Sequence, residues 1–334
     1  MKFLHKATTL IADFFHILSG KGGGFHDEEE RLLKAYYAGK PTKTSERAFK
    51  TGIVVMVDGR TMHGGLSDRL RGICSIYYWC KTHDVPFYIH FTYPFSLASY
   101  LPPASYDWTI EEDEISYSQE QARPALLMLH LLPSKLHKRY LNHLLPLARV
   151  KQLHVYSNTN VFDKHYKECF NELFTPAPPL HEAITAQLQQ FDDKPFIAMV
   201  LRFQQLLGDF KEGDYKVLPA AEREELIQRC LHQVDLIHSQ QAPNSLVLIT
   251  SESTTFLQRA VAKLPYVRII QGEVVHMDYT LDASYNVYLK SFVDMLTLSH
   301  AQHIYLLRTG DMYKSGFAYR AAAINDVPYT YIDF

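Results

Sequence analysis

A glycine-bearing loop follows the apolar segment IVVMV and leads into a helical pattern. The loop and the start of the helix read HGGLSDRLRG at residues 63–72. Glycines let the backbone come close to a ligand, and a helix N-terminus presents free N–H groups to an anion. The pattern predicts a phosphate-binding loop formed by Gly64, Gly65 and Leu66. The alternative is a plain glycine turn followed by a helix cap at Asp68.

A single arginine lies at the end of the apolar segment FIAMVLRF, residues 196–203. An arginine that ends a buried strand is costly to bury without an anionic partner, and its guanidinium group matches a phosphate through two parallel hydrogen bonds. Arg202 is therefore a candidate for binding an anionic ligand. The alternative is an ion pair within the fold, with Asp209 or Asp214 as partner.

Polar residues also follow the segment SLVLIT, which we expect to form another strand. Ser251 and Glu252 come directly after it, where a hydroxyl and a carboxylate could bind a ribose or a base edge. The alternative is a helix cap before the helix expected at residues 254–263.

Two further candidates lie toward the C-terminus. Asp294 stands among apolar neighbours in KSFVDMLTLS, where the alternative is a charge on a helix surface. A strand end, a polar loop and a helix of small residues then follow, and Ser315, Gly316 and Phe317 lie at the start of that helix. Such an arrangement can hold an anion on backbone N–H groups.

Alternating strands and helices must position these residues. The first half of the chain predicts strands at residues 53–57, 86–91 and 152–157, a helix at 68–83 and a helical region at 118–149. The second half predicts strands at residues 196–203, 245–250, 267–270, 303–307 and 328–332 and helices at 220–240, 254–263, 288–299 and 315–325. Such alternation predicts two α/β domains with parallel sheets. The proline-rich residues 175–180 mark the linker, so a ligand cleft is expected between the domains.

The composition is that of a globular protein. The 334 residues are 47% hydrophobic, and a net charge of −2 gives no broad basic surface for nucleic acid. Four cysteines without paired spacing and histidines without ligand spacing predict neither a disulfide framework nor a metal site. No signal peptide or membrane span is predicted, which favours the cytoplasm. Residues 1–20 form an amphipathic pattern that would pack on the protein or a second subunit, with peripheral membrane contact as the alternative.

In succession, these features resemble the GDP-fucose-dependent fucosyltransferase superfamily of GT-B fold, which includes the α1,2-, α1,6- and protein O-fucosyltransferases. GGLSDRLRG resembles the family's N-terminal "GGLGNRLR" loop, and VLRF with Arg202 resembles its "HxRR" strand. Ser251 and Glu252 resemble the family's "TDD" motif. VDMLTLS followed by SGFAYRAA resembles the family's last conserved motif. Val200 and Phe203 replace the family's histidine and second arginine.

The resemblance implies an α/β, GT-B-like fold with two Rossmann-like domains facing across a cleft. Residues 1–180 would be the acceptor-side domain and residues 181–334 the nucleotide-sugar-binding domain. It implies an inverting, metal-independent glycosyltransferase that transfers fucose from GDP-fucose, its donor substrate, with no further cofactor, to a glycan acceptor in surface-polysaccharide assembly. Arg202 would be catalytic, and Gly64, Gly65, Leu66, Glu252, Asp294, Ser315, Gly316 and Phe317 would bind the donor.

Two alternatives stay open at this point. One is a glycosyltransferase of the same fold that uses another nucleotide sugar. The other is a non-catalytic relative that binds a nucleotide or a glycan. The catalytic base is also open, since His63 and Asp68 are candidates by position only.

Overall fold

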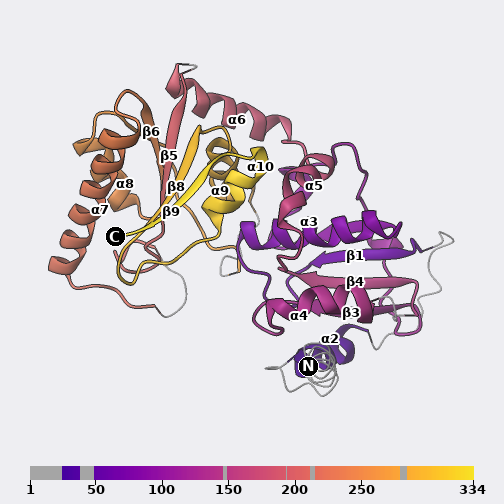
Figure 1. Ribbon diagram of the computed structural model, residues 1–334. Coiled ribbons are helices and arrows are strands. Elements are labelled where there is room, and N and C mark those ends of the chain that lie inside the picture. The colour runs from indigo at the N-terminus through magenta and orange to yellow at the C-terminus, as the bar shows by residue number, and fades with distance from the viewer. Residues whose placement is uncertain (1–24, 38–48, 146–148, 193, 211–214, 279–283) are drawn as a thin grey trace, which may run out of the picture. The chain divides into compact units, whose positions relative to one another are not determined.

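A computed structural model describes residues 25–37, 49–145, 149–192, 194–210, 215–278 and 284–334 (Figure 1). The amphipathic pattern at residues 1–20 lies outside the described residues. The chain forms two compact units, the first comprising Met1–Gly64, Asp68–Tyr93 and Pro103–Leu173, the second Gly65–Ser67, Pro94–Pro102 and Phe174–Phe334.

The described part of the first unit contains a parallel sheet of four strands in the order β2-β1-β4-β3. Its strands are β1 (Gly52–Val57), β2 (Phe87–Phe91), β3 (Ala122–Leu127) and β4 (Gln152–Ser157). Its helices are α2 (Phe25–Tyr36), α3 (Leu66–Thr82), α4 (Ser134–Arg139), a π-helical turn at Tyr140–Leu144 and α5 (Tyr166–Leu173). The strands β1 and β4 are neighbours in this sheet, with the other two strands outside them.

The prediction of a helical region at residues 118–149 is wrong in its first part. Residues 122–127 form strand β3, which pairs with β4 at the edge of the sheet. Pro124 has no N–H to donate, and an edge strand tolerates this because it leaves one side of its backbone unpaired. Pairing with β4 therefore overrides the local helical pattern. Helical structure begins only at Ser134.

The second unit has a parallel sheet whose described strands follow the order β7-β6-β5-β8-β9. These strands are β5 (Phe196–Leu201), β6 (Leu246–Thr250), β7 (Val267–Ile269), β8 (His303–Arg308) and β9 (Tyr329–Asp333). The helices are α6 (Pro178–Leu188), α7 (Ala220–Gln241), α8 (Thr254–Lys263), α9 (Tyr285–Leu298) and α10 (Phe317–Asn325). The order of strands reverses between β5 and β8, which is where doubly wound sheets bind ligands.

The second unit begins before the predicted linker. The two units divide at Leu173 and Phe174 rather than at residue 180. The reason is a contact with an earlier segment, since the Ala177 N–H donates to the Tyr100 carbonyl at 2.8 Å. The Tyr100 ring in turn stacks on Tyr285 and on Phe292 of α9, with centroid distances of 4.4 and 4.3 Å. The chain before the prolines is thus already part of the second core.

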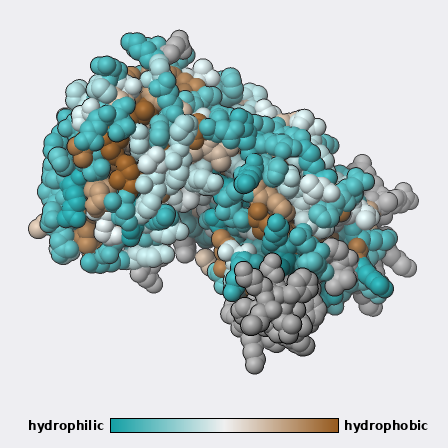
Figure 2. Space-filling model, in the orientation of Figure 1, coloured by the Kyte–Doolittle hydropathy of each residue, from teal (hydrophilic) through white to brown (hydrophobic). Residues whose placement is uncertain are grey.

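The visible surface is mainly hydrophilic, with small hydrophobic patches scattered over it (Figure 2). The helices in the described ranges all lack the combination of length and apolar character that a membrane span requires.

The packing of α3 on the sheet gives a first testable prediction. A Cβ added at Gly72 would lie 2.1 Å from the carbonyl oxygen of Ser157, at the end of β4, whereas a Cβ at Gly65 would meet no atom within 4 Å. We expect Gly72→Ala to lower the free energy of unfolding by about 1–3 kcal/mol, because backbone must move. Gly65→Ala, the matched control, should change it by less than about 0.5 kcal/mol. Urea unfolding of both variants measures the difference, and equal stabilities would contradict this packing.

Candidate functional site

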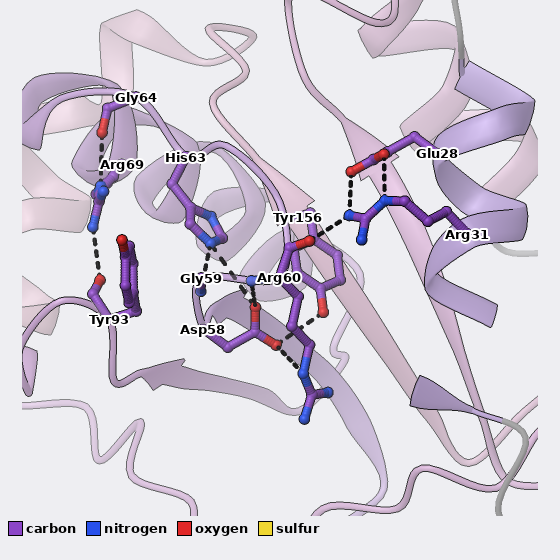
Figure 3. Close-up of polar contacts among 10 residues, drawn as sticks. All are labelled: Glu28, Arg31, Asp58, Gly59, Arg60, His63, Gly64, Arg69, Tyr93 and Tyr156. Atoms are coloured by element: carbon purple, nitrogen blue, oxygen red, sulfur yellow. Dashed lines mark hydrogen bonds and ion pairs between the residues drawn. The ribbon is translucent and has the colours of Figure 1, made fainter. Parts of the chain in front are cut away.

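In the first unit, a buried polar cluster lies at the carboxyl ends of β1 and β4 (Figure 3). Asp58 directly follows β1, and its Oδ2 accepts a hydrogen bond from the Tyr156 hydroxyl of β4 at 3.0 Å. Its Oδ1 accepts from the Arg60 N–H at 3.0 Å, and the Arg60 Nε lies 3.4 Å from Oδ2. The carboxylate therefore joins the two central strands and fixes the start of the loop that leads to the glycines.

His63 lies in the same cluster and is 2% exposed. Its Nε2 accepts a hydrogen bond from the Gly59 N–H at 3.1 Å, and its ring stacks on Tyr156. Burial, with a contribution from the charge of Arg69, lowers the pKa of His63 to about 3. A neutral imidazole that accepts from the backbone is suited to shape this loop rather than to take a proton from an acceptor hydroxyl.

This histidine gives a second prediction. Its pKa is lowered in the folded state, so its neutral form contributes stability that is complete above the usual pKa of 6.5 and is lost progressively as the pH falls toward about 3. The His63→Gln variant keeps an acceptor and has no such titration. We expect the free energy of unfolding of the wild-type protein to fall faster than that of the variant between pH 6.5 and pH 4, by up to about 1.4 kcal/mol per pH unit. Urea titrations at several pH values measure both slopes, and parallel curves would exclude the buried neutral histidine.

The predicted loop of Gly64, Gly65 and Leu66 is held by Arg69. The Arg69 side chain is fully buried, and it donates from Nε to the Gly64 carbonyl at 2.8 Å and from Nη1 to the Tyr93 carbonyl at 2.7 Å. Gly64 has a φ of +80°, which glycine adopts without strain. Arg69 therefore braces the loop through its backbone. Figure 3 shows this brace beside the Asp58 cluster.

Sequence reasoning missed Asp58, Tyr156 and the role of Arg69. A signal for Arg69 was present, since it lies three residues after Leu66 and four residues before Ile73 on α3, and both of these apolar residues are buried on the same helix face. Asp68, the other candidate base, is one-third exposed and forms an ion pair with Arg71 at 2.9 Å.

In the second unit, Arg202 lies directly after β5, beside the reversal of strand order. Its Nη1 lies 3.7 Å from Oε2 of Glu252, and its guanidinium carbon lies 4.7 Å from the centroid of the Phe210 ring. Burial raises the pKa of Glu252, while the charge of Arg202 acts in the opposite direction. Arg202 keeps 18% of its side chain exposed, so the side chain is partly accessible to solvent.

The ion pair differs from the one that the sequence suggested for Arg202. Asp209 accepts from the Ser253 hydroxyl and the Thr255 N–H, both at 2.8 Å, so it supports the start of α8. Ser253 itself caps α8 by accepting from the Phe256 N–H at 3.1 Å. Asp214 lies outside the described residues.

The loop after β8 reaches the same edge of the sheet. The Tyr313 N–H donates to the Arg202 carbonyl at 3.0 Å, which ties this loop to the end of β5. The Ser315 hydroxyl accepts from the Phe317 N–H at 3.1 Å, and Gly316 is the residue before the first turn of α10. Arg202, Glu252 and the predicted residues Ser315, Gly316 and Phe317 are thus brought to the carboxyl ends of β5, β6 and β8.

Asp294 lies inside α9, paired with a lysine of the same helix. It is 4% exposed within α9, and both of its carboxylate oxygens accept from Nζ of Lys290 at 2.8 Å. Burial raises the pKa of Asp294, and Lys290 acts against this shift. The alternative of a surface charge at Asp294 is therefore wrong, and its carboxylate is already held by a buried cation.

Metal-binding residue types do not gather in the described ranges, since no group of three or more His, Cys, Asp or Glu side chains is placed to hold an ion there.

Comparison with known proteins finds solved structures of similar fold. No protein-family model matches the chain, and no curated protein matches its sequence. NodZ α-1,6-fucosyltransferase soaked with GDP-fucose is similar to this chain with a TM-score of 0.56 and 13% sequence identity, over 85% of this chain and 95% of that one. Fucosyltransferase NodZ from Bradyrhizobium is similar to this chain with a TM-score of 0.55 and 12% sequence identity, over 81% of this chain and 92% of that one.

A plant enzyme is also similar to this chain in fold. A variant of Arabidopsis thaliana FUT1 in complex with GDP has a TM-score of 0.55 and 11% identity, over 97% of this chain and 78% of that one. The chain therefore has a fucosyltransferase-like α/β fold of the GT-B class, as the resemblance implies.

Proposed function

We propose that this protein is an inverting glycosyltransferase that uses a nucleoside diphosphate sugar, with GDP-fucose as donor. The observation that carries the proposal is the placement of Arg202 and the start of α10 together at the reversal of strand order in the second unit. A partly exposed arginine side chain beside a helix N-terminus suits a diphosphate. The proteins of similar fold include one soaked with GDP-fucose and one in complex with GDP, which supports this choice.

The departure of a nucleoside diphosphate develops negative charge on its outer phosphate. In the proposed reaction Arg202 stabilises that charge, together with the backbone N–H of Gly316 at the start of α10. The N–H groups of Ser315 and Phe317 donate to the Tyr313 carbonyl and the Ser315 hydroxyl, so these two residues would shape the loop around the donor. Preorganised donors of this kind are usually the largest catalytic contribution. The loop of Gly64, Gly65 and Leu66 would approach the donor through its backbone. The reaction so described needs no metal and no cofactor besides the donor substrate.

The remaining roles extend this proposal. We assign residues 181–334 to donor binding and residues 1–180 to the acceptor side. We further propose a glycan in surface-polysaccharide assembly as the acceptor and the cytoplasm as the location, with residues 1–20 as the segment for any peripheral membrane contact.

A second candidate function is transfer from a different nucleotide sugar. Phe203 occupies the place of the family's second arginine, and its side chain is fully buried against Phe256 at a centroid distance of 4.9 Å. That position therefore belongs to the core in this chain and offers no charge to a phosphate, which favours an altered donor site. The third candidate, a non-catalytic relative, would bind a nucleotide without turning it over.

Thermal-shift measurements with GDP, GDP-fucose, GDP-mannose, UDP-sugars and NAD test the proposal. A ligand at 100 times its Kd should stabilise the protein by about 2.7 kcal/mol. We expect GDP and GDP-fucose to raise the Tm, and release of fucose from GDP-fucose to follow. A response to UDP-sugars alone would move the assignment to another donor, binding without release would favour the non-catalytic relative, and no response to any nucleotide would refute the proposal.

A further inference from the structure

The buried carboxylate of Glu252 is occupied by the protein itself. Its side chain is 1% exposed, so it presents almost no surface to a ribose or a base. Oε1 accepts a hydrogen bond from the Gln204 N–H, and Oε2 accepts from the Ser251 hydroxyl at 3.3 Å. Oε2 also lies 3.7 Å from Nη1 of Arg202. Two of these contacts are with Arg202 and Gln204, which directly follow β5, and the third is with the neighbouring Ser251.

The loop that Glu252 holds contains a strained residue. Gln204 has a φ of +53°, in the left-handed region that is unfavourable for a residue with a side chain. The hydrogen bond from its N–H to Glu252 stabilises this conformation. Further along the loop, Asp209 accepts from Ser253 and Thr255, so the loop is attached to the next strand-to-helix connection at two points.

Arg202 lies at the root of this loop. Its guanidinium group is placed by the Glu252 carboxylate and by the Phe210 ring, which belongs to the same loop. A long arginine side chain has many rotamers in water, and fixing it beforehand removes that entropy cost from the binding of an anion. The pair therefore keeps a partly exposed cation in one orientation at the end of β5.

We infer that Glu252 is a positioning residue for Arg202, rather than a contact to the nucleoside. The expected effect on catalysis rests on the proposed function. The orientation of Arg202 by Glu252 rests on the geometry alone. Glu252 then has two actions, which are the stabilisation of the Gln204 turn and the orientation of the guanidinium group toward the site of charge development.

The decisive variant is Glu252→Gln. Its amide oxygen can still accept from the Gln204 N–H, so the turn is kept while the charge facing Arg202 is lost. Removal of a nearby negative charge does not weaken ground-state attraction for a diphosphate, but a misoriented guanidinium group stabilises the transition state less. We expect kcat for fucose transfer or donor hydrolysis to fall by about tenfold to a hundredfold. The Kd for GDP should stay within about threefold.

A double-mutant cycle separates positioning from general damage. In the Arg202→Ala background, Glu252→Gln should lower kcat no further, because there is no arginine left to orient. Glu225→Gln, at an exposed carboxylate paired with Arg229 on α7, is the control and should change neither constant. A Kd for GDP raised tenfold or more in Glu252→Gln, with kcat preserved, would instead make Glu252 a nucleoside contact and overturn the inference.

A second measurement needs no nucleotide, so it remains decisive if the proposed function fails. Phenylglyoxal modifies accessible arginines, and peptide mass spectrometry follows the modification of Arg202 against Arg308 as an internal reference. We expect Arg202 to react at least about threefold faster in Glu252→Gln than in the wild type, since its ion pair is lost. Equal rates for Arg202 in the two proteins would show that Glu252 does not restrain it.

Discussion

Replacing Arg202 by alanine is expected to slow turnover of the nucleotide-sugar donor by roughly 10²–10³-fold, the usual effect of removing one donor aimed at developing charge. The side chain lies at the carboxyl end of β5, beside the reversal of strand order and joined through its carbonyl to the loop after β8. The loss should therefore appear in kcat as well as in GDP affinity.

Two further variants make this experiment specific. Arg202→Lys keeps the charge but loses the planar fork, so we expect an intermediate loss of turnover. Arg229→Ala removes an exposed positive charge from α7 and serves as the control for net charge. Circular dichroism and Tm should first establish that each variant is folded. Turnover of Arg202→Ala within a factor of three of the wild type would remove Arg202 from the proposed mechanism.

The buried pair in α9 carries the largest expected effect on stability. Lys290→Met should lower the free energy of unfolding by about 3–5 kcal/mol, because it leaves the carboxylate of Asp294 buried without its cation. Both side chains are nearly inaccessible, with 6% of Lys290 and 5% of Asp294 exposed, and both carboxylate oxygens accept from the same ammonium group. Urea or guanidinium unfolding at pH 7 measures the change.

The double variant Lys290→Met/Asp294→Leu distinguishes a charge left unpaired from a loss of packing. Removing both charges should lower the free energy of unfolding by less than removing the lysine alone, since no buried ion remains. A double variant as unstable as the sum of the two single variants would contradict this explanation. Asp294→Asn, assayed for GDP binding, tests the separate proposal that this acid also contacts the donor.

The sequence by itself determined most of the secondary structure and the positions of the candidate loops. The apolar segments ending before Asp58, Arg202 and Ser251 form β1, β5 and β6 as predicted, and the polar residues fall at their carboxyl ends. This succeeds because alternation of apolar strands and amphipathic helices is a local property, and parallel connection of such units follows from general rules of chain topology. The fucosyltransferase-like character of the fold was indicated by the resemblance of the motifs, taken in succession, to that family.

Only the tertiary structure decided which partners the polar residues take. Residues 122–127 became a strand because β4 offered an edge to pair with, a contact about 30 residues away that local pattern does not contain. Arg69 turned out to brace two carbonyls, Glu252 to hold the Gln204 turn, and Asp294 to face Lys290 inside α9. The physical reason is common to all of them. A buried charge must find a partner in three dimensions, and residue type and spacing along the chain show only that a partner is needed, without identifying it.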